Sequence, residues 1–155
     1  TGRRLAAARG PHLPPRAYVA AGALYLVATV ALGAGTVLGQ PWGAAYAFVA
    51  IAGWLGQTVN CHLLHIGTRF LATLVRGDDD ETPPHDLLEP ALSWAAFACY
   101  QAAVLAGAGA ALLDAPTWAG AAGALGLAGW ATFSAGALVA WRRALRPEAP
   151  ASAPE

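Results

Sequence analysis

The sequence contains no methionine and no lysine, and charged residues make up only 12% of its 155 residues. Soluble domains usually carry roughly twice that share of charge. By contrast, 57% of the residues are hydrophobic and the mean hydropathy is positive. These values exclude an ordinary soluble domain and indicate an integral membrane protein. The net charge is zero, and the nine basic residues, all arginines, lie outside the longest apolar runs, so no nucleic-acid partner is expected.

Cysteines and acidic residues are also scarce where chemistry would need them. Cys61 and Cys99 each lie within an apolar segment, which favours two buried thiols over a structural disulfide. No Asp or Glu lies in the middle of an apolar run, so a proton relay has little support. Ser93 and Ser134 have no histidine at a spacing that suggests a nucleophile and its base. The chain is therefore expected not to be an enzyme.

Four apolar segments predict four transmembrane helices, because each is long enough to cross a hydrocarbon core of about 30 Å. The expected ranges are about 17–39, 43–75, 90–113 and 117–144. They predict an all-α fold, an integral membrane four-helix bundle with up-down topology, in one domain covering residues 17–145. Residues 1–16 are expected to form a basic flexible arm and residues 146–155 a disordered tail. Asp114 or Thr117 is expected to cap the fourth helix.

The arginines set the expected orientation. Four precede the first helix, two end the second and three follow the fourth, whereas neither of the other two turns contains a basic residue. Short cytoplasmic segments are enriched in arginine and lysine. Both termini are therefore expected to be cytoplasmic, in a multi-pass protein of the bacterial cytoplasmic (inner) membrane. The first arginines are followed by Pro and His where a signal peptide would have its apolar core, so no cleavable signal is expected.

The second apolar segment is the only one that carries several polar side chains in its middle. With about 100° per residue around a helix, seven of them fall within one arc of roughly 140° and an eighth lies just outside it. Polar groups in lipid need protein partners, so this stripe is expected to be a polar interior face. Its members are Gln57, Thr58, Asn60, Cys61, His62, His65, Thr68 and Arg69.

His62 and His65 are the candidate cofactor-binding residues. They are three residues apart on one helix, so they cannot hold both faces of one haem, and the other three helices contain no histidine. Within one copy a haem b would have a single histidine ligand. A metal site would combine these histidines with Cys61 and Cys99. The remaining alternative is that the polar stripe bonds to neighbouring helices, lipid headgroups, or a pigment or quinone held by a partner.

The segment GWLGQTVNCHLLHIGTRF, followed by TPPHDLLEPALSW, resembles the C-terminal four-helix portion of bacterial membrane proteins related to haem-copper oxidase subunit I. The resemblance covers about residues 45–140. His65 stands where that family has Lys, and Thr68 where it has Pro. The residues that fit the family pattern are Gly53, Trp54, Leu55, Gly56, Thr58 and Ile66. The resemblance implies a respiratory or photosynthetic setting without the upstream helices that carry haem and copper.

Taken together, these features predict a non-catalytic accessory or structural transmembrane subunit of a larger bacterial energy-converting complex, involved in respiratory or photosynthetic electron transfer. The glycines at 120, 123, 126 and 129 would give the fourth helix a smooth face for close packing of another helix. The expected partners are other transmembrane subunits and lipids. The alternative is a small haem-b or metal-binding membrane protein that uses His62 and His65 for electron transfer or sensing.

Overall fold

The computed structural model describes residues 14–76 and 87–145. These residues form four helices that are long and apolar enough to cross a membrane, and no strand occurs among them. The predictions of an all-α fold and of four helices long and apolar enough to cross a membrane are therefore confirmed. The predicted tail, residues 77–86, which include five acidic residues, and the first thirteen residues of the predicted arm lie outside the described residues.

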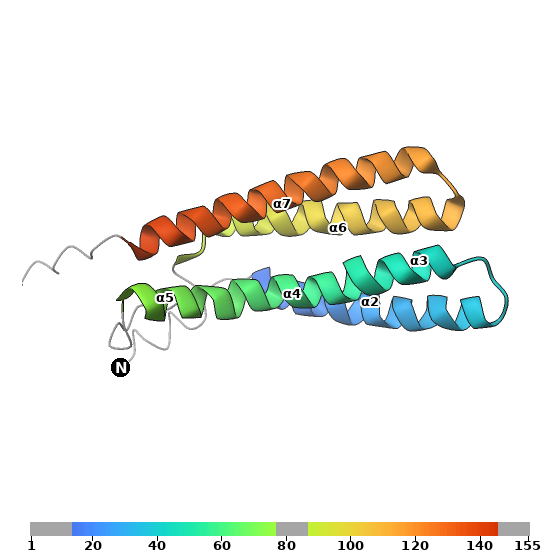
Figure 1. The fold of residues 1–155 in the computed structure, drawn as a ribbon, viewed down its shortest axis with the longest axis horizontal. Helices are drawn as coiled ribbons and strands as arrows, with labels where there is room; N and C mark the ends of the chain where they lie inside the picture. Colours follow the sequence, from blue (N-terminus) through green and yellow to red (C-terminus); the bar gives the residue numbers. More distant parts are fainter. Residues whose placement is uncertain (1–13, 77–86, 146–155) are drawn as a thin grey trace, which may run out of the picture.

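The helices form two hairpins that lie side by side (Figure 1). In the first hairpin, α2 (Pro14–Val37) is followed by the second span, Gly43–Val75, which returns in the opposite direction. In the second hairpin, α6 (Pro90–Leu113) is followed by α7 (Pro116–Ala144). The start of α2 and the end of α7 lie at one end of the bundle, here called the basic end; the two short connections lie at the other, the turn end.

Helix α2 begins at Pro14, three residues before the expected start, because proline fits the first turn of a helix, where its missing N–H would have no intrahelical partner. It ends in a Schellman motif. Gly39 has a positive φ of 89°, and the Gln40 N–H donates to Gly35 O at 2.9 Å. A residue without Cβ adopts this conformation at no steric cost, so Gly39 fixes where the first hairpin turns.

The connection between α6 and α7 differs from the expectation that Asp114 or Thr117 caps α7. The residue before α7 is Ala115, and no side chain caps this helix. Asp114 instead ends α6 in the left-handed conformation, with φ 49° and ψ 46°, and the Ala115 N–H donates to Ala110 O at 3.1 Å. Asp tolerates this conformation better than most side chains. Pro116 then starts α7 in the favoured first-turn position.

The second span is one continuous run of helix in which α-helical and π-helical segments alternate. The sequence predicts a uniform helix here and gives no sign of the two wider π segments, whose backbone hydrogen bonds skip one residue more than in an α-helix. The order is α3 (Gly43–Phe48), η1 (Val49–Leu55), α4 (Gly56–His62), η2 (Leu63–Gly67) and α5 (Thr68–Arg76).

Helix α6 connects the two hairpins. Near the basic end, the Phe97 ring on α6 meets the Tyr18 ring on α2 edge-on, with centroids 4.9 Å apart. Near the turn end, a Cβ added at Gly107 on α6 would lie 2.3 Å from the Phe48 ring on α3, so these two helices are in close contact. Helix α7 packs chiefly on α6, and its main contact with the first hairpin is at α5. One side of α7 is therefore left uncovered along most of its length.

Candidate functional site

The predicted polar stripe of the second span does not form a single inward face. Gln57 and Thr68 are buried, whereas Asn60 and Cys61 are only partly buried. Four members, Thr58, His62, His65 and Arg69, are exposed on the surface of the chain. The stripe is wider than the face that this span buries. Only 22% of the residues in the most apolar stretch of the span are buried, so the buried face covers a smaller arc than the 140° of the stripe. The remaining polar residues lie beside that face.

The two candidate haem ligands therefore face away from the interior of the bundle. The His62 ring nitrogen Nδ1 lies 2.7 Å from Thr58 O, one turn earlier on the same helix. His65 is also exposed, and neither histidine lines any of the hollows described below. Among residues 14–76 and 87–145, no three His, Cys, Asp or Glu side chains come together as a metal site. A haem held by these histidines would need further walls from outside the described residues.

Threonine hydroxyl groups in the spans form hydrogen bonds with carbonyl groups of their own helices. The Thr58 hydroxyl donates to Trp54 O at 3.0 Å and the Thr68 hydroxyl to Leu64 O at 2.7 Å, each four residues back. Thr132 on α7 donates to Ala128 O in the same way. This local bonding meets the need of a hydroxyl group for a partner in lipid. Threonines in the spans are therefore no evidence for a ligand by themselves.

The first π segment creates an acceptor for the other hairpin. The Gly56 N–H is directed at Ile51 O and Gly53 O, and it skips Ala52 O, its usual partner in an α-helix. The hydroxyl of Tyr100 on α6 donates to this same Ala52 O at 2.7 Å. It can come so close because residue 56 has no side chain: a Cβ there would lie 1.9 Å from the Tyr100 oxygen.

Two glutamines of the bundle, Gln57 and Gln101, have buried amide atoms. The Tyr25 hydroxyl on α2 donates to Gln101 Oε1 on α6 at 3.0 Å, which leaves Gln101 Nε2 buried and without a hydrogen-bond partner in the described part of the chain. Gln57 is fully buried, and both its amide atoms lack such a partner. A buried amide without a hydrogen bond is costly, by about 1–3 kcal/mol in proteins. Gln57 was predicted to face inward, but no sequence signal separates it from Thr58.

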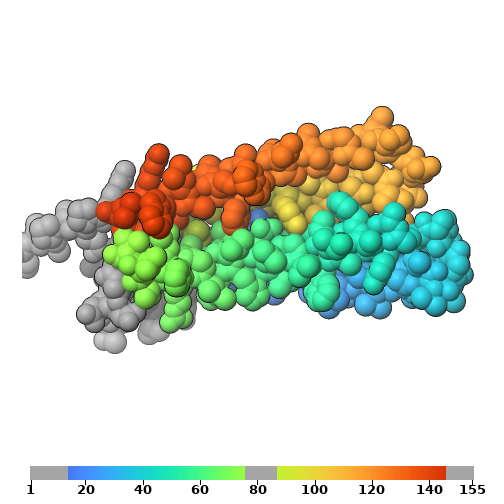
Figure 2. All heavy atoms as spheres, in the orientation of Figure 1, coloured from blue at the N-terminus to red at the C-terminus, as the bar shows by residue number. Residues whose placement is uncertain are grey.

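Three hollows lie between the hairpins, one after another along α7. Near the turn end is a groove of about 630 Å³, the turn-end groove; near the basic end is one of about 280 Å³, the basic-end groove. A middle hollow of about 270 Å³ separates them. It shares Tyr100 with the turn-end groove and Phe133 with the basic-end groove. Figure 2 shows α7 lying over the second span, with α6 visible between them toward the turn end.

The two grooves have different walls. Small residues dominate the turn-end groove, which is lined by Phe48, Ala52, Tyr100, Ala103, Val104, Gly107, Ala110, Ala111, Asp114, Ala115, Pro116, Ala119, Ala122, Gly123 and Gly126. Larger aliphatic and aromatic side chains dominate the basic-end groove, which is lined by Leu63, Leu64, Gly67, Thr68, Leu71, Leu88, Leu92, Ser93, Thr132, Phe133, Gly136, Ala137, Ala140 and Trp141. The first is wide and smooth, and the second is narrower.

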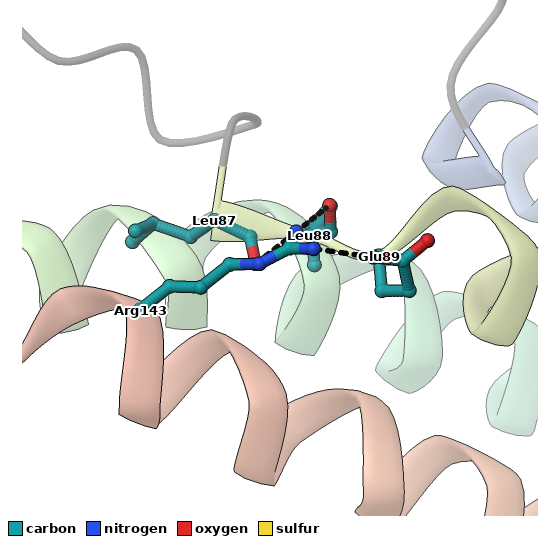
Figure 3. Close-up of polar contacts among 4 residues, drawn as sticks. All are labelled: Leu87, Leu88, Glu89 and Arg143. Carbon is teal, nitrogen blue, oxygen red and sulfur yellow. Dashed lines mark hydrogen bonds and ion pairs between the residues drawn. The ribbon is translucent and has the colours of Figure 1, made fainter.

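At the basic end, one arginine ties the second hairpin together (Figure 3). Arg143 on α7 donates to Leu88 O at 2.9 Å and forms an ion pair with Glu89, the residue that precedes α6. These contacts neutralise Glu89 and use the Arg143 guanidinium. Arg69 on α5 and Arg142 on α7 are exposed and make no hydrogen bond or ion pair with another described residue. Two positive charges therefore remain available here.

Comparison of the chain with family models, with curated proteins and with solved structures found no match. The two grooves between the hairpins are therefore the features of this chain that bear most directly on its function.

Proposed function

We propose that this protein is a non-catalytic accessory subunit that packs against other transmembrane helices in a larger membrane complex. The observation that carries the proposal is the turn-end groove. Helices in lipid associate where small residues let their backbones approach closely, since no hydrophobic driving force pulls them together. Ala119, Ala122 and Gly123 on α7 offer such a surface, and Ala103 and Gly107 on α6 continue it.

A helix of a partner protein is the occupant that suits this groove. The groove has a volume of about 630 Å³ and is the largest of the three hollows described above. Its wall is open at Gly123, where an added Cβ would meet no atom within 4 Å. Aromatic residues are also enriched at interfaces between proteins, and Trp118 and Trp130 on α7 are 52% and 70% exposed. A partner helix in the groove would cover the open side of α7.

We further propose that both termini are cytoplasmic and that the complex belongs to a bacterial energy-converting membrane, with a role in respiratory or photosynthetic electron transfer. The orientation is supported by Arg16, Arg69, Arg142 and Arg143, which all belong to helix segments at the basic end. The setting is supported by the resemblance of residues 45–140 to proteins related to haem-copper oxidase subunit I. Tags at either terminus should be accessible only from the cytoplasm; accessibility from outside would contradict the orientation.

The experiment for the main proposal is extraction in a mild detergent, followed by native gel electrophoresis. The chain should migrate together with other membrane subunits. Gly123→Leu fills the turn-end groove without meeting another atom at its Cβ, so it should release the chain from the complex. Gly120→Leu is the matched control, because Gly120 also faces open space but does not line the groove. Wild-type protein that migrates as a stable monomer would overturn the proposal.

The alternative, a haem-b or metal-binding protein, has one observation in its favour: His62 and His65 are both exposed and accessible from outside the bundle. An absorption spectrum of the purified protein separates the two functions. A Soret band that disappears in His65→Ala would favour haem binding over the purely structural role.

A further inference from the structure

The middle hollow is lined by two polar side chains that have no partner in the described chain. Tyr18 on α2 is only 1% exposed, and its hydroxyl makes no hydrogen bond with another described residue. Asn60 on α4 is partly buried, and its amide also makes no such bond. A polar group without a hydrogen bond is costly in the apolar part of a membrane bundle. These two groups therefore need a polar partner inside the hollow.

The Tyr18 side chain is fixed in place by its packing. Its ring meets the Phe97 ring edge-on, with centroids 4.9 Å apart, and it belongs to a buried cluster with Leu64 and Leu88. A ring held on several sides cannot swing its hydroxyl toward a different helix. The donor is therefore already in position, and a ligand that uses it loses little affinity to the ordering of this side chain.

The walls of the hollow indicate a neutral ring compound. Three aromatic side chains besides Tyr18 line it, namely Tyr100, Trp130 and Phe133, and aromatic rings pack well against other flat rings. No Asp, Glu, Lys or Arg is among the lining residues, so an ionic ligand would have no counter-ion. A saturated hydrocarbon chain would leave Tyr18 and Asn60 without partners. Trp130 is 70% exposed, so this wall reaches the surface of the chain, where a molecule dissolved in the membrane can enter.

We propose that the middle hollow binds a neutral, membrane-soluble ring compound that carries a carbonyl group. The carbonyl oxygen accepts hydrogen bonds from the Tyr18 hydroxyl and the Asn60 amide, and the ring lies against Phe133 and Trp130. A carbonyl oxygen has two lone pairs, so it can accept from both donors at once. Mainly apolar walls with a few placed polar groups are typical of small-molecule sites, and the volume of about 270 Å³ limits the ligand to a small ring system.

The test is isothermal titration calorimetry of the purified full chain, in a mild detergent, with 9-fluorenone and with fluorene. These probes have the same planar rings, and only fluorenone has a carbonyl group. The wild type should bind fluorenone more tightly, since each hydrogen bond contributes a gain in affinity of about two- to tenfold. Tyr18→Phe keeps the ring and removes the donor, so it should weaken fluorenone binding by this factor and leave fluorene binding unchanged.

Two further variants complete the design. Asn60→Leu removes the second donor and should lower the preference for fluorenone by a similar factor. Tyr46→Phe is the matched control for Tyr18→Phe, because Tyr46 lines none of the three hollows, and it should bind both probes as the wild type does. Circular dichroism and gel filtration verify that each variant is folded.

Three results would overturn this proposal: no saturable binding of fluorenone, equal affinity of the wild type for the two probes, or a preference for fluorenone that Tyr18→Phe leaves unchanged. The first two need only the wild-type chain and so do not depend on the folding of a variant. Water held by Tyr18 and Asn60 in place of the ketone would give the second result. The site is independent of the proposed partner helix: Tyr18→Phe should leave subunit association unchanged, and Gly123→Leu should leave fluorenone binding unchanged.

Discussion

Replacing Gly56 by alanine should destabilise the bundle only while Tyr100 keeps its hydroxyl group. An added Cβ at position 56 would lie 1.9 Å from the Tyr100 oxygen but 3.2 Å from the ring carbon that carries it. Gly56→Ala alone must push the tyrosine away and break its hydrogen bond to Ala52 O. Tyr100→Phe alone removes the bond and leaves the ring in place. In the double variant, the alanine meets only a tight ring contact.

The expected free energies follow from these contacts. Tyr100→Phe should lower the free energy of unfolding by about 0.6 kcal/mol, the average for an interhelical hydrogen bond in a membrane protein. Gly56→Ala should lower it by about 1–3 kcal/mol through steric overlap, offset by up to about 1 kcal/mol from the better helix propensity of alanine. In the Tyr100→Phe background that overlap largely disappears. The double variant should therefore be more stable than the sum of the single changes predicts, by about 1–2 kcal/mol.

Reversible unfolding in mixed micelles, followed by far-UV circular dichroism, measures this cycle. Tyr25→Phe is the matched control for Tyr100→Phe. It also removes a hydrogen bond between the hairpins, the one to Gln101, but it does not contact position 56. Its effect should add to that of Gly56→Ala. Additivity of Gly56→Ala with Tyr100→Phe, within about 0.5 kcal/mol, would refute the close contact between these two residues.

Three further predictions concern stability in the same assay. Gln57→Leu should raise the free energy of unfolding by about 1–3 kcal/mol, because it removes a buried amide without a partner among the described residues; a loss of stability would show that the amide has a bound partner. Gly107→Ala should cost about 1–3 kcal/mol through overlap with the aromatic ring on α3, whereas Gly120→Ala, in open space, should cost nothing. Glu89→Gln should cost less than about 1 kcal/mol, because the side chains of this ion pair are about one third exposed. Arg143→Gln should lower the free energy of unfolding more than Glu89→Gln, since it also removes hydrogen bonds to backbone carbonyls. Equal losses in the two variants would contradict the backbone contacts of Arg143 shown in Figure 3.

The sequence predicts the helices of this fold well because their signals are local. Uninterrupted apolar runs identify the four membrane-length helices, and the prolines at positions 90 and 116 stand at the first residues of α6 and α7. The π segments of the second span have no such signal. The carbonyl of Ala52, which the first π segment leaves free, accepts a hydrogen bond from Tyr100, a residue 48 positions away. The reason for this π segment therefore lies in a contact that forms only when the two hairpins pack together.

The candidate site was less predictable than the fold. Helical periodicity placed Gln57 and His62 on one polar stripe, yet the first is fully buried and the second is exposed. Which part of that stripe faces inward depends on where α2 and α6 contact the second span, and periodicity in one helix does not contain this information. The grooves lie between residues from separate hairpins, such as Leu71 and Ala140. Their shape therefore depends on how the hairpins sit together.

The one-sided attachment of α7 has a consequence for biosynthesis. The first three helices already share the contacts of Tyr25 with Gln101 and of Tyr100 with Ala52, and none of these contacts involves the last helix. A three-helix intermediate therefore already has two hydrogen bonds that can hold α6 against the first hairpin while α7 is still being translated. Integration of α7 would then complete the protein as a late, separate step, and a subunit that joins the complex at this moment would meet its docking surface newly formed.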